Sequence, residues 1–187
     1  SAGVRTLTLY AIGTNDHATN DHTTDPEIDA NLRILSAYLQ GNSRYCERES
    51  IRVSVVGQCP RPGARLLRTI GPPPEPASGA RLHLRIVVDY SAHDSVVQST
   101  WCSPGPRAPE TFARRLREID DTALPAGAVD LLIRTGAGRC LSDYLLWEVA
   151  YARLHFADCL WPDFSTREFQ RALAFYRGCE ASTVRIS

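Results

Sequence analysis

One short segment in the second half of the chain carries residues suited to holding an anion. Residues 131–142 read LLIRTGAGRCLS, and Arg134 is the first residue after an apolar run. Gly136 and Gly138 allow a sharp turn that exposes backbone N–H groups, and Ser142 is a favourable N-cap for a following helix. Together with the helix N-terminus, these groups predict an anion cradle. The alternative is a plain strand–loop–helix connection with an arginine at the surface.

A second polar segment, NDHATNDHTTD at 15–25, contains side chains that could bind a metal or transfer protons. Its acidic and histidine spacings match no metal motif, so a solvated loop is the alternative interpretation. The loop follows the first apolar run. In open α/β sheets ligands bind beyond the carboxyl ends of the strands, so this loop is expected to face the same crevice as Arg134. We therefore predict that it acts as a lid or supplies a catalytic residue, with Asp16 and His17 as the candidates.

Alternating strands and helices are needed to position these two loops. Apolar runs rich in Val, Ile and Leu predict four strands, at 5–12, 51–56, 82–88 and 129–133. Amphipathic patterns predict helices at 26–40, 109–119, 145–156 and 166–176. This order predicts an α/β fold with a central, mostly parallel sheet flanked by helices.

The segment 144–164 holds more apolar and aromatic residues than one helix face can bury. Trp147, Tyr151, Leu154 and Phe156 are therefore expected in a core or in the interface of a symmetric homodimer. Arg153 lies among them and needs an anion, solvent or a carboxylate. The carboxylate partner would be Asp158 or Asp163.

Length and composition exclude several classes of protein. The chain has 187 residues, of which 43% are hydrophobic, and this suits a single domain over 1–187. Its 21 basic and 21 acidic residues cancel, so the charge does not indicate a nucleic-acid partner or an acidic membrane surface. No apolar run approaches the ~20 residues that span a bilayer. The six cysteines form no CxxC pair, which favours reduced thiols in a cytoplasmic protein.

Three segments together resemble the cis-prenyltransferase family, which includes undecaprenyl diphosphate synthases. The longest is DLLIRTGAGRCLSDYLLWEVAYARLHFADCLWPDF at 130–164, which is similar to the signature region of that family. The other two are LTLYAIGTND at 7–16 and LHLRIVVDYSAHDSVV at 82–97. The resemblance keeps the order and spacing of the family motifs over nearly the whole chain. The family's first motif, an Asp-Gly-Asn segment, has no counterpart in the sequence, so we expect an N-terminal segment before Ser1.

The resemblance implies a function for the predicted cradle. Members of the family condense isopentenyl diphosphate with an allylic diphosphate, use Mg²⁺ and form dimers. Arg134 and Ser142 fall on family positions that bind the isopentenyl diphosphate group, so the anion of the cradle is expected to be a diphosphate. Gly136, Gly138 and Arg139 belong to the same loop and are predicted to contribute to it.

Several polar family residues are replaced in this chain. The family has Glu at Gly138, Arg at Cys140 and a Mg²⁺-binding carboxylate at Arg153. It has Asn at Asp16, Trp at His17 and Arg at His93. A guanidinium can neutralise a diphosphate without a metal, so Arg153 is predicted to approach the diphosphate.

Ordinary cis elongation is the default that the resemblance implies, and these replacements leave two further functions open. The first is a prenyl diphosphate-using transferase with altered chemistry, namely irregular coupling or cyclisation of an allylic diphosphate, in which Asp16 or His17 orients or deprotonates the reacting carbon. The second is a non-catalytic subunit that dimerises with an active prenyltransferase. Mg²⁺ is the expected cofactor, but the sequence leaves open whether the protein depends on it.

Overall fold

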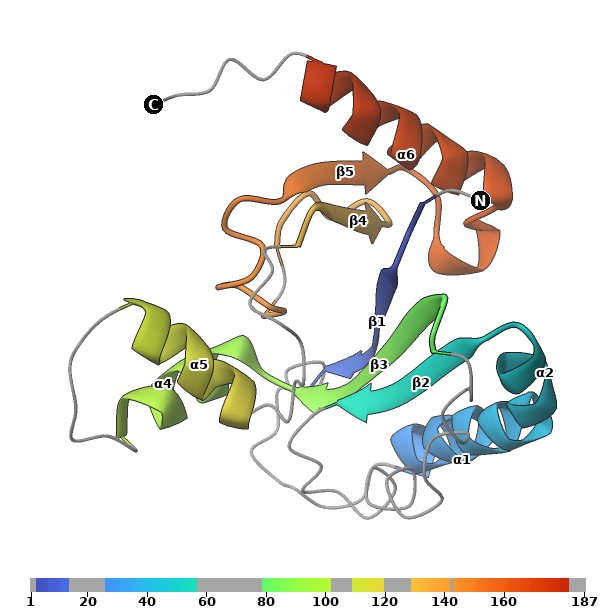
Figure 1. Ribbon diagram of the computed structural model, residues 1–187, viewed down its shortest axis with the longest axis horizontal. Coiled ribbons are helices and arrows are strands. Elements are labelled where there is room, and N and C mark those ends of the chain that lie inside the picture. Colours follow the sequence, from blue (N-terminus) through green and yellow to red (C-terminus); the bar gives the residue numbers. More distant parts are fainter. Residues whose placement is uncertain are drawn as a thin grey trace. The chain divides into compact units, whose positions relative to one another are not determined.

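The computed structural model describes residues 3–13, 26–56, 79–101, 109–119, 129–141 and 143–181. The chain divides into two compact units, Ser1–Ala123 and Leu124–Ser187, coloured from blue to yellow and from orange to red in Figure 1. Each unit is described by itself below, and the single domain over 1–187 stays a prediction.

Three parallel strands form the sheet of the first unit: β1 (Thr6–Gly13), β2 (Ile51–Val56) and β3 (Leu82–Tyr90). β3 lies between the other two, and its Leu84 pairs with Leu7 on one side and Val53 on the other. All three strands start within one residue and end within two residues of their predicted positions. Their Val, Ile and Leu content indicated a sheet covered by other chain segments, as parallel sheets usually are.

Two helices that follow β1 pack on one face of this sheet. They are α1 (Pro26–Gly41), which begins at the predicted residue, and α2 (Ser43–Arg48), which was not predicted. The hydrophobic core contains Leu32 and Leu39 of α1, Cys46 of α2, and Val53, Ile86 and Val88 of the strands. Burial raises the pKa of the Cys46 thiol, because the thiolate loses its hydration there.

The other face of the same sheet is more polar, because successive side chains of a strand point to opposite faces. Arg85 is only 2% exposed, and its Nη1 donates a hydrogen bond of 3.3 Å to Oγ1 of Thr8. Ser54 Oγ and His83 Nε2 are hydrogen-bonded at 2.9 Å on this face. The helices α4 (Ala92–Trp101) and α5 (Pro109–Ile119) complete the described part of the unit, and only α5 was predicted.

The second unit contains a parallel pair of strands, β4 (Leu131–Thr135) and β5 (Arg153–Ala157). A 3₁₀ turn, η2 (Trp161–Asp163), leads into α6 (Thr166–Ala181), which packs against β5 and is longer than the predicted 166–176. Every described strand pairing in the protein is parallel. The predicted α/β class, with mostly parallel strands flanked by helices, is therefore confirmed.

The helix predicted at 145–156 is wrong. Residues 143–151 form bends and turns, and residues 153–157 form β5. Leu145 has a φ of 45°, which a non-glycine residue rarely adopts and which cannot continue a right-handed helix. One turn, closed by the Val149 N–H and the Leu145 carbonyl at 2.9 Å, has the helical spacing. Instead of ending a helix, residues Arg153–Ala157 form a strand that pairs with β4.

Candidate functional site

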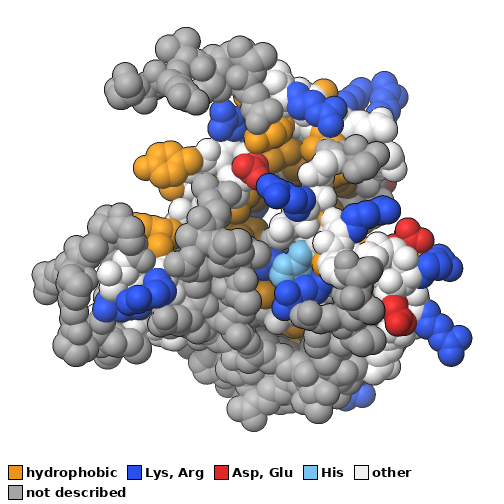
Figure 2. Space-filling view, viewed as in Figure 1, with side chains coloured by type: hydrophobic (Ala, Val, Ile, Leu, Met, Phe, Trp, Pro, Cys, Tyr) orange, Lys and Arg blue, Asp and Glu red, His pale blue; other side chains and the backbone are white. Residues whose placement is uncertain are grey.

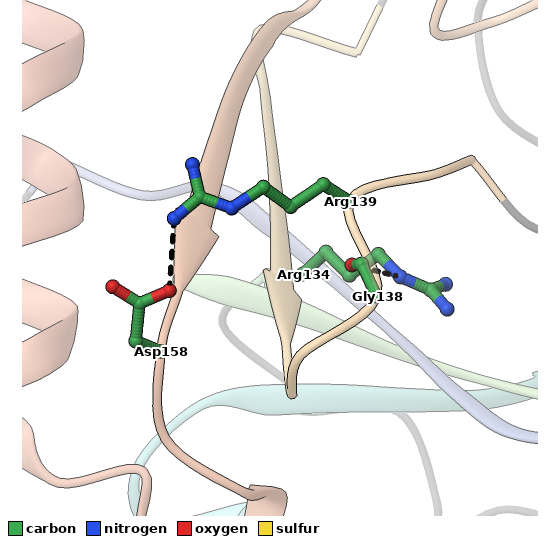
Figure 3. A network of polar contacts seen from close by, with 4 residues as sticks. All are labelled: Arg134, Gly138, Arg139 and Asp158. Atoms are coloured by element: carbon green, nitrogen blue, oxygen red, sulfur yellow. Dashed lines mark hydrogen bonds and ion pairs between the residues drawn. The ribbon is translucent and has the colours of Figure 1, made fainter.

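The loop after β4 begins with an arginine whose side chain folds back over it. Arg134 is the fourth residue of β4 rather than the first one beyond it, and it pairs with Phe156 of β5. Its Nε donates a hydrogen bond of 3.1 Å to the carbonyl oxygen of Gly138, as Figure 3 shows. This bond holds the guanidinium against the loop backbone, so the orientation of the Arg134 side chain is set by the loop itself.

Gly136 makes the turn that lets the loop leave β4. Its φ is 92°, which favours glycine because a side chain at that angle meets the backbone. The Gly136 N–H donates to the carbonyl of Cys159 at 2.8 Å. That N–H is therefore engaged by the segment after β5 and does not point to an anion.

Gly138 has a different role, because its φ lies outside the left-handed region. A Cβ built there would lie 3.4 Å from Nη2 of Arg134, 3.8 Å from its Nε and 4.0 Å from Sγ of Cys140. These are ordinary van der Waals distances. A side chain at 138 would therefore stand beside both the guanidinium and the exposed Cys140 thiol.

Arg139 points to the other side of the loop. Its Nη2 lies 3.1 Å from Oδ1 of Asp158, in an ion pair whose side chains are 70% and 80% exposed. In Figure 3 the guanidinium groups of Arg134 and Arg139 extend in opposite directions from the loop backbone. Asp158 was one of the two carboxylates considered as an alternative partner of Arg153, and the structure pairs it with Arg139.

Arg153 is not brought together with Arg134. It opens β5, where it pairs with Leu131, and its N–H donates to the carbonyl of Asp130 at 3.0 Å. Leu131 precedes Arg134 by three residues, which is ~10 Å along a strand and an odd number of positions. Paired residues share a face of a sheet, so the side chains of Arg153 and Arg134 start from opposite faces of the β4–β5 pair.

Three other predicted site residues, Asp16, His17 and Ser142, lie outside the described residues, so their roles stay predictions. The helix that Ser142 was expected to cap is absent, since the residues after it form turns. The prediction that a helix N-terminus contributes to the anion cradle is therefore wrong.

Among the described residues, no group of three or more His, Cys, Asp or Glu side chains could hold a metal ion. Mg²⁺ usually takes one or two protein carboxylates together with phosphate oxygens, so its role in this protein stays a prediction. No described helix is long and apolar enough to cross a membrane.

Asp158 and the Cys159 carbonyl are parts of the site that the sequence reasoning missed. Both follow β5, which had been assigned to a helix. Parallel strands end at the same edge of a sheet. Had β5 been recognised as a strand, its end would have placed Asp158 next to the loop after β4.

Comparison with known proteins identifies the family. The family model described as "Putative undecaprenyl diphosphate synthase" matches residues 1–182. Isoprenyl transferase 1 of Bradyrhizobium diazoefficiens is 35% identical over 181 residues, covering 95% of this chain and 70% of that protein. The ditrans,polycis-undecaprenyl-diphosphate synthase ((2E,6E)-farnesyl-diphosphate specific) of Escherichia coli K12 is 29% identical over 177 residues, covering 91% and 68%.

A solved structure shares the fold. Lavandulyl diphosphate synthase from Lavandula x intermedia, in complex with dimethylallyl diphosphate, superposes with a TM-score of 0.75 at 21% identity, over 94% of this chain and 77% of that one. The family model spans nearly the whole sequence, including the loop that carries Arg134. The chain therefore belongs to the undecaprenyl diphosphate synthase family of prenyltransferases.

Proposed function

We propose that this protein is a transferase that uses prenyl diphosphates and holds one diphosphate group at the loop after β4. The observation that carries the proposal is the bond between Arg134 and the Gly138 carbonyl, which orients a guanidinium at the carboxyl end of a parallel strand. Ligands bind at that edge in open α/β sheets. Guanidinium groups bind phosphate oxygens in pairs and keep their charge at any physiological pH.

The proposed chemistry begins with an allylic diphosphate. Its carbon–oxygen bond breaks, and the electron pair leaves with the diphosphate. The carbocation is then attacked by a carbon–carbon double bond, and loss of a proton from the new cation forms a double bond and removes the positive charge of the carbon skeleton. Asp16 or His17 is the proposed group that orients or deprotonates the reacting carbon. Arg134, Arg139, Ser142 and Gly138 are proposed to hold diphosphate, and Gly136 shapes the loop, since its N–H is bonded to the Cys159 carbonyl.

We further propose that the chemistry differs from simple chain elongation and proceeds by irregular coupling or cyclisation. The support is that two charged family residues are replaced next to Arg134. Gly138 leaves the space beside the guanidinium without a carboxylate, and Cys140 puts a thiol where the family has an arginine. Both changes alter the charge around the diphosphate of the second substrate more than the ionisation of the first.

The alternative is a non-catalytic subunit that pairs with an active prenyltransferase. It is favoured by the ion pair between Arg139 and Asp158. Arg139 is next to Cys140, where the family has an arginine, and the ion pair keeps Arg139 from replacing that arginine. Under either alternative we propose that the second unit forms a dimer interface. Tyr151, Leu160 and Trp161 are 84%, 65% and 61% exposed, and Figure 2 shows hydrophobic side chains at the surface of this part of the molecule, among arginines.

Product analysis distinguishes these functions. The protein is incubated with dimethylallyl, geranyl or farnesyl diphosphate, each with and without isopentenyl diphosphate, in the presence of Mg²⁺ and of a chelator. Irregular or cyclic products support altered chemistry, and linear products with cis double bonds indicate ordinary elongation. No turnover of any combination, together with retained diphosphate binding, indicates the non-catalytic subunit.

Two variants sharpen the test of altered chemistry. Gly138→Glu and Cys140→Arg restore the family residues at positions where the backbone accepts a side chain. If their loss alters the chemistry, the double variant should shift the products towards linear elongation. The control for the positive charge of Cys140→Arg is Cys179→Arg on α6, which adds an arginine outside the loop and should leave the product distribution unchanged.

A further inference from the structure

The two arginines of the loop after β4 are held by partners of different kinds. Arg134 is bonded to a backbone carbonyl, which cannot move away from the loop. Arg139 is paired with the carboxylate of Asp158, which belongs to the segment after β5. One guanidinium is therefore fixed to the loop itself, and the other is held to one side by a neighbouring segment.

The pair between Arg139 and Asp158 is easily exchanged. Both side chains are mostly exposed, and exposed ion pairs are weak because water screens them and both side chains lose freedom. A diphosphate offers a guanidinium several oxygens and more than one negative charge. A diphosphate beside Arg134 would therefore compete well with one carboxylate for Arg139.

We propose that Asp158 is a positioning residue that holds Arg139 away from the anion site, and that a bound diphosphate takes Arg139 over from Asp158. This inference rests on the proposed function of the loop. Arg139 would then supply a second guanidinium in place of the family arginine that is replaced by Cys140. Asp158 lowers the affinity for diphosphate, because its contact with Arg139 has to break before the ligand is fully bound.

The probe is inorganic diphosphate, and its binding to the whole protein is measured by titration calorimetry. Asp158→Asn removes the charge that holds Arg139 and keeps the size of the side chain. We expect the dissociation constant to fall about fivefold, which is about 1 kcal/mol. Arg139→Gln should raise it about tenfold. Asp158→Glu keeps the carboxylate and should stay near the unmodified protein.

The double variant, Asp158→Asn with Arg139→Gln, separates this mechanism from simple loss of a nearby negative charge. With Arg139 absent, Asp158→Asn should no longer improve binding. An equal improvement in both backgrounds would overturn the proposal, and so would Arg139→Gln binding as tightly as the unmodified protein. Glu168→Gln is the matched control, because Glu168 forms a similar pair with Arg171 on α6 at 2.6 Å. It should leave binding unchanged.

Failure of the proposed function gives a different result. If the loop does not hold diphosphate, Arg134→Gln binds the probe as well as the unmodified protein does. If only the role of Asp158 is wrong, Arg134→Gln weakens binding and the Asp158 variants do not change it. In a catalytically active protein, Asp158→Asn should lower KM for isopentenyl diphosphate and leave kcat within twofold, which a purely structural role would not produce.

Discussion

The two parallel sheets of this protein bury their side chains to very different extents. In the first unit, Val87 and Val88 of β3 are fully buried and Val53 of β2 is 2% exposed. In the second unit, every residue of β4 is only partly buried, and Tyr151 just before β5 is 84% exposed. The comparison suggests that the first unit supplies most of the folding stability. The second carries the polar loop and several exposed apolar side chains.

The largest effect on stability is expected from a substitution that creates a cavity in the core of the first unit. Leu32 of α1 is 1% exposed and lies in the core with Val53 and Ile86. Leu32→Ala should lower the free energy of unfolding by about 2–5 kcal/mol, because it removes buried methyl groups and leaves a void. Urea denaturation followed by circular dichroism measures this change.

Ile34 provides the matched control in the same helix, since it is 67% exposed. Ile34→Ala should change the free energy of unfolding by no more than ~0.5 kcal/mol. Similar losses for the two variants would mean that α1 does not carry the core of the first unit, and the comparison between the units would fail.

The second effect should appear in binding rather than in stability. Arg134→Gln removes a charged donor from the loop of the second unit. Hydrogen bonds to charged groups contribute about 1.5–3 kcal/mol, so the affinity for inorganic diphosphate should fall about 10- to 100-fold. Calorimetric titration measures the affinity, and the urea midpoint should stay nearly unchanged.

Arg171→Gln on α6 is the control for this loss of charge. Arg171 is an exposed arginine of the same unit that contacts Glu168. Its replacement should leave diphosphate affinity within twofold. Equal weakening by both variants would point to a general effect of charge and would remove Arg134 from the site.

The sequence predicted the first unit better than the second for physical reasons. The strand runs at 51–56 and 82–88 carry Val, Ile or Leu at every second position or more, and this local pattern suffices to identify them. Residues 145–156 carry apolar spacings that suit a helix, yet Arg153–Ala157 pairs with β4. The pairing depends on a neighbour far away in the chain, and a local pattern does not contain that information.

The same distinction applies to the site. The glycine turn was predicted correctly, because Gly136 has the positive φ that such a turn needs. Arg134 was predicted just beyond the strand and is instead the fourth residue of β4. Asp158 was not assigned to this loop, because its contact with Arg139 joins residues 19 positions apart. The carbonyl of Cys159 was missed for the same reason.

A smaller effect is expected from the two loop glycines, which differ in backbone angle. Gly136→Ala should cost about 1–2 kcal/mol, because its φ of 92° is unfavourable for a residue with a side chain. Gly138→Ala should cost no more than ~0.5 kcal/mol, because the new Cβ meets ordinary contact distances. Thermal unfolding of the two variants side by side measures the difference. Equal losses would show that Gly136 does not determine the turn.

The smallest effect is expected at Arg153, where the resemblance and the geometry lead to different expectations. If Arg153 serves as the cation that replaces a Mg²⁺ carboxylate, Arg153→Glu should weaken diphosphate binding as much as Arg134→Gln, or make it newly dependent on Mg²⁺. The strand register favours a weaker effect, because Arg153 pairs with Leu131 and starts from the face opposite to Arg134. At ~10 Å or more and physiological salt, the interaction between exposed charges is strongly screened. We therefore expect the dissociation constant of inorganic diphosphate to rise no more than about threefold, with Mg²⁺ or with a chelator. Calorimetric titration with Mg²⁺ and with a chelator decides between the expectation from the resemblance and the expectation from the geometry. A tenfold or greater loss of affinity that Mg²⁺ restores would place Arg153 at the diphosphate. The register of β4 and β5 alone would then not explain how the Arg153 side chain reaches it.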